Sequence, residues 1–134
     1  MGDQMKYAAL TGISPAIIGE IRKGKPRTLE LQSAHNIITL TEVNPGDCLF
    51  MTSIDLEDLS PGDCGILVDV ISLTINMKRL VEYLNPFYYE ERERMSARIQ
   101  VRYIDSTIAR EVEGQNWGRP TCVDAIKSAY YHAG

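Results

Sequence analysis

Six polar side chains near the start of the chain lie within ten residues of one another and are suited to binding a nucleobase. They are Arg27, Glu30, Gln32, Ser33, His35 and Asn36. A carboxylate accepts hydrogen bonds from exocyclic amines and an amide both donates and accepts, so Glu30 beside Gln32 can read the Watson–Crick edge of a base. The guanidinium of Arg27 can hold a phosphate through two hydrogen bonds. We therefore predict ligand-binding roles for Arg27, Glu30, Gln32, His35 and Asn36, against a plainer interpretation as a surface Arg–Glu pair with a histidine that caps a turn.

The same residues allow a second interpretation, in which the protein is a small hydrolase acting on a modified nucleoside or RNA. Glu30 would act as the base, and His35, whose ring can accept a proton near neutral pH, would assist. No serine or cysteine stands at a recognisable spacing from His35, and the chain has no GxGxxG, Walker, HExxH or GxSxG motif. The sequence therefore identifies no catalytic residue, and we favour a binding module over an enzyme.

A second candidate site is the most regular pattern in the chain, between residues 92 and 103. Apolar residues alternate there with arginine and polar residues, as in a strand with one core face, and the core face would be formed by Met95, Ala97, Ile99, Val101 and Tyr103. Arginines on the other face would follow the phosphates of an RNA strand, and such contacts weaken with salt. We predict Arg94, Arg98 and Arg102 as contacts to the nucleic-acid backbone, against the alternatives of a solvated face or an interface with another chain. Aromatic residues close to them in sequence, which would stack on bases, are Tyr83, Phe87, Tyr88, Tyr89 and Trp117.

Charge is unevenly distributed along these 134 residues, which carry a net charge of −4. No Lys or Arg occurs from Thr28 to Met77, whereas this stretch contains eight Asp and Glu residues. The net charge argues against a strongly basic nucleic-acid clamp but leaves room for a local basic face. It also allows a third interpretation, a structural or regulatory homodimer in which the arginine face of one copy meets the acidic middle of another.

The elements that position these residues are mostly short strands. Alternating or continuous apolar patterns predict strands at 6–11, 27–32, 48–52, 65–73, 92–103 and, after a turn near 105, 108–112. Residues 33–43 fit a short helix or a strand, and their threonines favour a strand. Ser14 and Pro15 are typical of a helix start and Gly24 of its end.

A closing helix is expected at the end of the chain. Pro120 or Thr121 would begin it, and its inner stripe would consist of Val123, Ile126, Ala129 and Tyr130. We therefore predict a single α+β domain over residues 1–134. It would be a small, mostly antiparallel β-barrel with an early helix and a C-terminal helix.

Two similar turns lead into the middle strands. Asn44-Pro45-Gly46-Asp47-Cys48 is matched sixteen residues later by Ser60-Pro61-Gly62-Asp63-Cys64. Pro followed by Gly favours a type II turn with Gly at positive φ. Because the repeat is short, we expect two strand entries in one barrel and not a solenoid.

Other features limit the cellular and chemical class. The chain is 44% hydrophobic and 24% charged, has no apolar run of about 18 residues for a membrane span, and begins without the basic and apolar regions of a signal peptide. Its cysteines, Cys48, Cys64 and Cys122, form no CxxC pair, which is typical of buried thiols in a reducing cytoplasm. We expect a cytoplasmic protein with no membrane partner, no metal and no cofactor.

Residues 13–71 resemble the PUA-like superfamily and, within it, the ASCH-type domains. The similarity is a helix, a glycine and a strand reading basic-x-x-Glu, here Gly24 to Gln32, followed by a Gly-Asp turn. The family usually has Arg at the position of Gln32. Some ASCH relatives hydrolyse an amide on a modified cytidine with Lys and Thr where this chain has Arg27 and Glu30, and an arginine cannot deprotonate to act as a base. The resemblance therefore implies an ASCH-type barrel without that amidase mechanism.

The chain also resembles, nearly from end to end, an archaeal family known as domain of unknown function 473. The shared pattern consists of residues 9–14, 27–30, 33–36 and the two Pro-Gly-Asp turns. This family has no assigned activity, so the resemblance implies membership and no function. Together, these observations predict an uncharacterised PUA-like binding module that recognises RNA or a nucleotide-like ligand.

Overall fold

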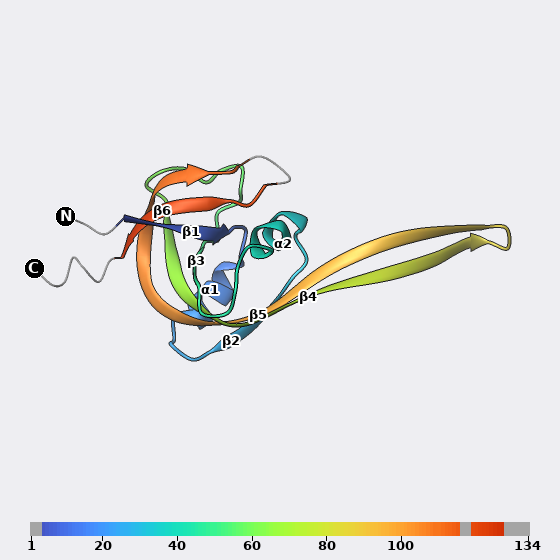
Figure 1. The fold of residues 1–134 in the computed structure, drawn as a ribbon, viewed down its shortest axis with the longest axis horizontal. Helices are drawn as coiled ribbons and strands as arrows, with labels where there is room; N and C mark the ends of the chain where they lie inside the picture. The colour runs from blue at the N-terminus through green and yellow to red at the C-terminus, as the bar shows by residue number, and fades with distance from the viewer. Residues whose placement is uncertain (1–3, 116–118, 128–134) are drawn as a thin grey trace, which may run out of the picture.

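The computed structural model describes residues 4–115 and 119–127, except for the side chains at 4, 5, 80, 82, 84, 89–93, 126 and 127. Within this part the chain forms six strands and two helices (Figure 1). In chain order they are β1 (Gln4–Leu10), α1 (Pro15–Ile21), β2 (Arg27–Leu31), α2 (Ala34–Leu40), β3 (Cys48–Met51), β4 (Cys64–Asn85), β5 (Tyr88–Glu113) and β6 (Cys122–Lys127). The predicted α+β class is confirmed.

The strands form one mixed sheet in the order β2-β5-β4-β3-β1-β6. β6 pairs with β1 and also with β5, so the pairings run in a ring from β5 through β4, β3, β1 and β6 back to β5. β1 and β3 are parallel, and the other pairs are antiparallel. Most of the pairing is therefore antiparallel, as the sequence predicts.

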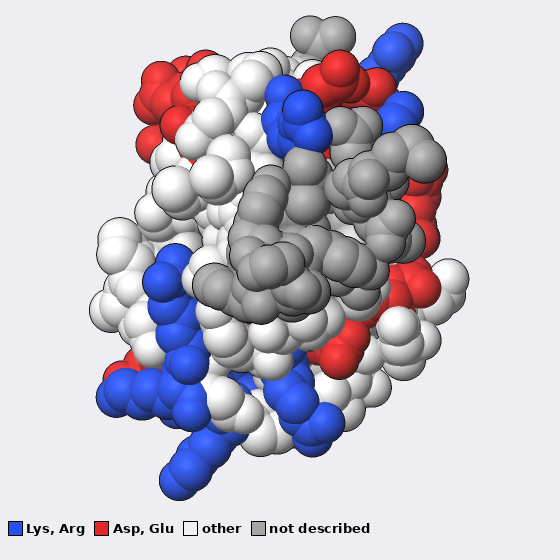
Figure 2. Space-filling view, turned by 90° about the vertical axis from the view of Figure 1, so that its left-hand side faces the viewer, with Lys and Arg blue, Asp and Glu red and all other residues white. Residues whose placement is uncertain are grey.

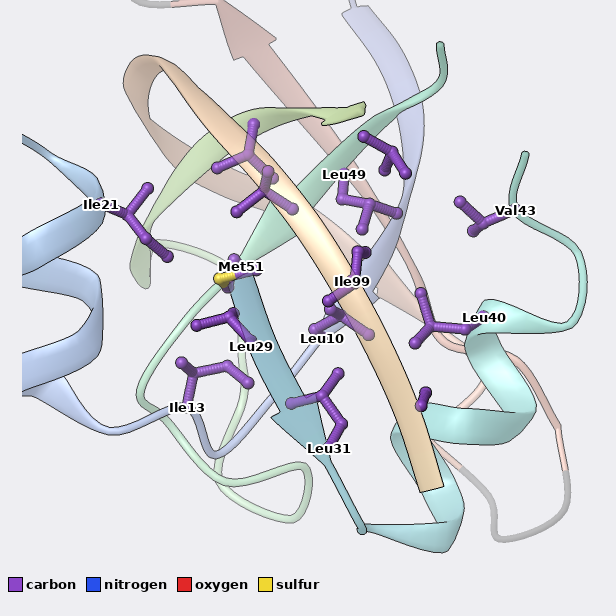
Figure 3. Packing of buried hydrophobic residues seen from close by; sticks show 14 of the residues in the cluster. Leu10, Ile13, Ile21, Leu29, Leu31, Leu40, Val43, Leu49, Met51 and Ile99 are labelled. Carbon is purple, nitrogen blue, oxygen red and sulfur yellow. The ribbon is translucent and has the colours of Figure 1, made fainter. Parts of the chain in front are cut away.

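Both faces of the central strands are buried, because their side chains alternate between two hydrophobic clusters. Along β3, Leu49 and Met51 lie in the larger cluster and Phe50 lies in the smaller one. The larger cluster includes inner side chains of β2 and of both helices, and Figure 3 shows Leu29 and Leu40 among them. Burying a side chain of this size contributes about 1.5–3 kcal/mol. This cluster therefore holds β2 and α2, the elements that carry most of the predicted ligand-binding residues.

β4 and β5 form a hairpin that is much longer than the other strand pairs. Its strands pair as far as Asn85 with Tyr88, next to the connecting turn. β2 accompanies β5 only as far as Ala97, and β3 accompanies β4 only as far as Asp69. Figure 1 shows the distal half of the hairpin leaving the rest of the molecule as a two-stranded arm. We call residues 74–98 the arm and the remaining described residues the body.

Both Pro-Gly turns form as expected. Gly46 and Gly62 have φ of +96° and +99°, a conformation that glycine adopts without a Cβ clash. Asp47 closes the first turn by accepting a hydrogen bond from the N–H of Asn44 at 2.9 Å, and Asp63 makes the same bond in the second turn at 2.8 Å. The first turn leads into β3 and the second into β4.

The predicted C-terminal helix is wrong, because the described part of this segment is strand β6. Val123 and Ala125 are buried whereas Cys122 and Asp124 are half-buried, so burial alternates with the period of a strand. β6 also pairs along both edges, with β1 and with β5. This tertiary pairing overrides the weak helix-start signal at Thr121.

Two further expectations about the strands are wrong. Residues 34–40 form helix α2, because Ile37 and Leu40 lie three residues apart and both enter the larger cluster, which is a helical spacing. β5 continues through Asp105 without the expected turn. A register shift against β4 leaves Ile104 as an extra residue, so a bulge bends the strand where the turn was expected.

The early helix is confirmed by α1, which begins at Pro15 with Ser14 as its N-cap residue. In the described residues, no helix is both long enough and apolar enough to cross a membrane. The stacking prediction for Trp117 and the helix predictions for Ala129 and Tyr130 concern residues outside the described part of the chain.

Candidate functional site

β2 places predicted ligand-binding residues on the outside of the sheet. Leu29 and Leu31 are buried in the larger cluster, so the intervening Glu30 is exposed. Arg27 at the start of β2 and Gln32 just beyond its end are exposed as well. The alternation in the sequence predicts this arrangement of β2, and the structure confirms it.

Glu30 lies directly beside the arginine face of β5. The antiparallel register places Glu30 opposite Arg98 and Thr28 opposite Gln100. Arg98 donates a hydrogen bond to Oε1 of Glu30 at 2.9 Å, and the two side chains are 65% and 63% exposed. The structure therefore brings Glu30 of the first predicted site and Arg98 of the second together on one surface, although these residues are 68 positions apart.

A row of basic side chains runs along this surface and onto the arm. Arg94, Arg98 and Arg102 are four residues apart, so they share one face of β5, and all three are exposed. Lys78 of β4 pairs with Arg94 in the register and is also exposed. We call these four residues the basic stripe, which extends over roughly 26 Å at about 3.3 Å per residue.

Glu30 and Asp69 border the basic stripe on the body. Asp69 lies opposite Arg102 in the β4–β5 register, and its Oδ1 accepts a hydrogen bond from the Cys48 thiol at 3.4 Å. A second group of exposed basic residues lies between the end of α1 and the start of β2: Arg22, Lys23, Lys25 and Arg27. Figure 2 shows basic side chains gathered in the lower part of the side that faces away from the arm, at the level of β2 in Figure 1.

Asn36 lies away from the basic stripe, buried on α2. Its Oδ1 accepts a hydrogen bond from the N–H of Thr11 at 3.0 Å, and its Nδ2 donates to the carbonyl of Thr11 at 2.9 Å. Both residues are buried. The amide thus pairs with both backbone groups of the residue after β1, which ties α2 to the end of β1.

His35 is also buried, on the same helix. Its Nε2 forms a hydrogen bond with Oγ1 of Thr121. Because that hydroxyl donates its one proton to the carbonyl of Gly114 at 2.9 Å, Nε2 of His35 must be the donor. Burial lowers the pKa of His35, so the ring is neutral at pH 7. His35 therefore ties α2 to the residue that precedes β6.

A polar pocket of about 340 Å³ lies beside these two residues. It is lined by Thr11, Gly12, Ser33, His35, Asn36, Asp55, Leu56 and Glu57. The predicted ligand-binding residues are therefore divided between two places: His35 and Asn36 line this pocket, whereas Arg27, Glu30 and Gln32 do not. The hydrolase interpretation needs Glu30 and His35 at one site, and the pocket does not bring them together.

Sequence reasoning missed two acidic residues that line this pocket, Asp55 and Glu57. Both belong to a polar loop of ordinary appearance. In the sequence, the signal for this loop was the glycine at position 12. Gly12 has φ of +65°, and a Cβ added at this position would lie 3.1 Å from Oδ1 of Asp55. A glycine is therefore needed where the chain leaves β1 and passes this loop.

Cys48 and Cys122 line a second pocket, of about 440 Å³, together with residues that include Lys6 and Asp47. Both cysteines are half-buried thiols that form no disulfide, and burial raises the pKa of the Cys122 thiol. A thiol in this state is protonated at neutral pH and is a poor nucleophile. Among the residues with described positions, no group of three or more His, Cys, Asp and Glu is placed to hold a metal ion.

Comparison with known proteins identifies the family. Residues 5–123 match the family described as "Protein of unknown function (DUF473)", so the chain belongs to this family, as its sequence patterns predict. The chain is 31% identical over 103 residues to the uncharacterized protein MJ0105 of Methanocaldococcus jannaschii. This similarity covers 77% of the chain and 64% of the length of that relative. No solved structure matches the chain.

Proposed function

We propose that this protein binds RNA through the basic stripe. The observation that carries the proposal is the exposed row of Arg94, Arg98 and Arg102 along one face of β5, with Lys78 beside Arg94. Cations spread over roughly 26 Å suit a chain of phosphates better than a single small anion. Arginine also holds phosphate oxygens through paired hydrogen bonds, which a lysine does not.

Polar side chains beside the stripe supply contacts to bases. Thr28 and Gln100 lie opposite one another on the same face, next to Glu30, and Gln32 follows at the end of β2. Arg27 is exposed at the start of the strand but alternates with Thr28 and Glu30, so it offers a separate phosphate contact off the face that carries the stripe. The exposed pair between Glu30 and Arg98 does not block binding, because such pairs contribute only about 0.2–1 kcal/mol and a phosphate can replace the carboxylate.

The negative net charge is compatible with this proposal because few acidic residues of the middle of the chain border the stripe. The eight Asp and Glu residues between Thr28 and Met77 account for much of the acidity, and in that stretch only Glu30 and Asp69 border the stripe. A local field, and not the net charge, steers a polyanion to its site. The proposal places this binding in a reducing cytoplasm, and the support for that location is three cysteines that form no disulfide.

The proposal includes a barrel of the PUA-like type for the body. Its support is the ring of pairings that β6 completes between β1 and β5, together with a basic-x-x-Glu strand, β2, that follows a helix and a glycine. Nuclear Overhauser contacts test the ring: Ala125 should lie close to both Met5 and Ala109 across the two pairings. Contacts on one side only would contradict ring closure.

RNA binding is tested by fluorescence anisotropy with a labelled single-stranded RNA of mixed sequence. Arg94→Ala/Arg98→Ala/Arg102→Ala removes three charges from the stripe and should weaken binding at least tenfold. The matched control, Lys6→Ala/Arg110→Ala/Arg119→Ala, removes three exposed charges elsewhere on the chain and should retain most of the binding. Equal losses in both variants would show a nonspecific charge effect, and no binding by the wild type at low salt would refute the proposal.

A further inference from the structure

The arm exposes large apolar side chains, most of them near its tip. Met77, Tyr83, Phe87 and Tyr88 are 61%, 77%, 89% and 67% exposed. Val81 and Met95 are exposed to a lesser degree. On the described part of the body, the exposed large apolar residues are Ile71, near the base of the arm, and Ile108. Apolar surface is therefore concentrated on the arm.

One face of the arm continues the core face of the sheet. The register shift at Ile71 turns the odd-numbered residues of β4 toward the larger cluster, against which Leu73 and Ile75 pack. The same row then continues along the arm through Met77, Arg79, Val81 and Tyr83, with Met95 of β5 paired to Met77. We call Met77, Val81, Tyr83 and Met95, together with Phe87 in the turn at the tip, the apolar face, whereas Tyr88 lies an even number of positions from Arg94 on β5 and shares the face of Arg94.

A two-stranded ribbon of this length needs further packing to be stable in water. Isolated two-stranded hairpins are at best marginally stable without another layer or strand. Beyond Ala97 of β5 and Asp69 of β4, no other described strand pairs with the outer edges of the hairpin. Soluble monomers also rarely expose apolar patches larger than a few hundred Å². The arm therefore has the properties of an interface element.

We propose that the apolar face packs against the same face of a second copy of this chain, which makes the protein a homodimer joined through its arms. The body offers few exposed apolar side chains, so the best complement for the arm within this chain is another arm. A twofold axis brings identical patches together, which is the usual arrangement of homodimers. This inference goes beyond RNA binding and does not depend on it.

The exposed area fits a small dimer interface. Tyr83 and Phe87, which are 77% and 89% exposed, contribute on the order of 300 Å² per copy, since an aromatic side chain offers about 150–250 Å². Adding Met77, Val81 and Met95 brings the face to the ~500 Å² per partner that a specific interface needs at least. The row that bears Lys78 and Arg94 lies on the opposite face of the arm, so pairing of the apolar faces leaves the basic stripes of both copies accessible.

The test is the mass in solution, measured by light scattering over a wide range of protein concentration. The wild type should have twice the chain mass of 15.0 kDa. Met77→Ser/Tyr83→Ser/Phe87→Ser should be a folded monomer, because these side chains are exposed in the single chain. The matched control, Thr74→Ser/Lys78→Ser/Arg94→Ser, changes three residues on the opposite face and should remain a dimer.

A second variant distinguishes the loss of dimerisation from misfolding of the arm. Joining Asn76 to Ser96, which pair in the register, through an Asn-Gly turn removes the apolar face and leaves the body intact. This short-arm chain should unfold cooperatively and be monomeric. A wild type that is monomeric at every concentration, or a short-arm chain that is still dimeric, would overturn the proposal. A dimer lost in the control and kept in the apolar-face variant would also overturn it, in favour of the arginine-to-acid dimer.

Discussion

Asn36→Ala should lower the free energy of unfolding by about 3 kcal/mol, because the side chain serves both backbone groups of Thr11. The two hydrogen bonds, at 3.0 and 2.9 Å, join residues that are only 3% and 6% exposed. A buried donor or acceptor left without its partner costs about 1–3 kcal/mol. Two such groups give about 2–6 kcal/mol, and partial access to the neighbouring pocket favours the lower half of that range.

Thermal and urea unfolding measure this loss. A change of this size should lower Tm by roughly 10 °C in a chain of this length. Ser33→Ala is the control on the same helix. It removes only the N-cap bond to the N–H of Asn36, which is long at 3.4 Å, so its cost should stay near about 0.5–1 kcal/mol.

The reasoning would be refuted if Asn36→Ala had a Tm within about 2 °C of the wild type. If that stable variant also lost a ligand, Asn36 would be a binding residue, as its sequence position alone suggests. Asn36→Asp refines the test, because an ionised carboxylate still accepts from the N–H of Thr11 but cannot donate to its carbonyl. At neutral pH this variant should be destabilised, although it keeps the size of the side chain.

Three further predictions concern single residues. In Gly65→Ala the new Cβ would overlap the ring of the fully buried Phe50. The free energy of unfolding, measured by thermal unfolding, should therefore fall by about 1–3 kcal/mol or more. An unchanged Tm would contradict this packing. Because burial lowers the pKa of His35 below its ordinary value of 6.5, the unfolded chain binds this proton at higher pH than the folded chain does. The contribution of His35 to stability is therefore complete above pH 6.5 and declines as the pH falls below that value. His35→Gln should flatten the dependence of Tm on pH in this range. An unchanged dependence of Tm on pH would refute the prediction. Glu30→Gln removes the carboxylate that pairs with Arg98, so RNA binding measured by anisotropy should tighten about two- to fivefold, and weaker binding would show that Glu30 contacts the ligand.

Local patterns predicted the elements whose own residues decide their conformation. In β2, the alternation around Glu30 reflects one buried and one exposed face, and the same period identifies the arginine face of β5. The glycines at 46 and 62 mark turns because their backbone conformation suits no other residue well. These features depend on neighbours in sequence, which is why they can be read directly.

Features that depend on distant pairing could not be read in this way. β6 is a strand because β1 and β5 both pair with it, while its own residues also fit a helix. α2 is a helix despite its β-branched residues, because Ile37 and Leu40 reach the larger cluster together. The division of the candidate site has the same origin. The register places Glu30 beside Arg98, while the bonds to Thr11 draw Asn36 into the interior.

The salt dependence of RNA binding tests the central claim most directly. For single strands, each phosphate neutralised contributes about −0.7 to the slope of log K against log salt. Arg94→Ala/Arg98→Ala/Arg102→Ala should therefore make the slope shallower by about 2, while Lys6→Ala/Arg110→Ala/Arg119→Ala should keep the slope of the wild type. If the stripe variant keeps the slope of the wild type, the basic stripe does not contact the RNA backbone and the account is contradicted.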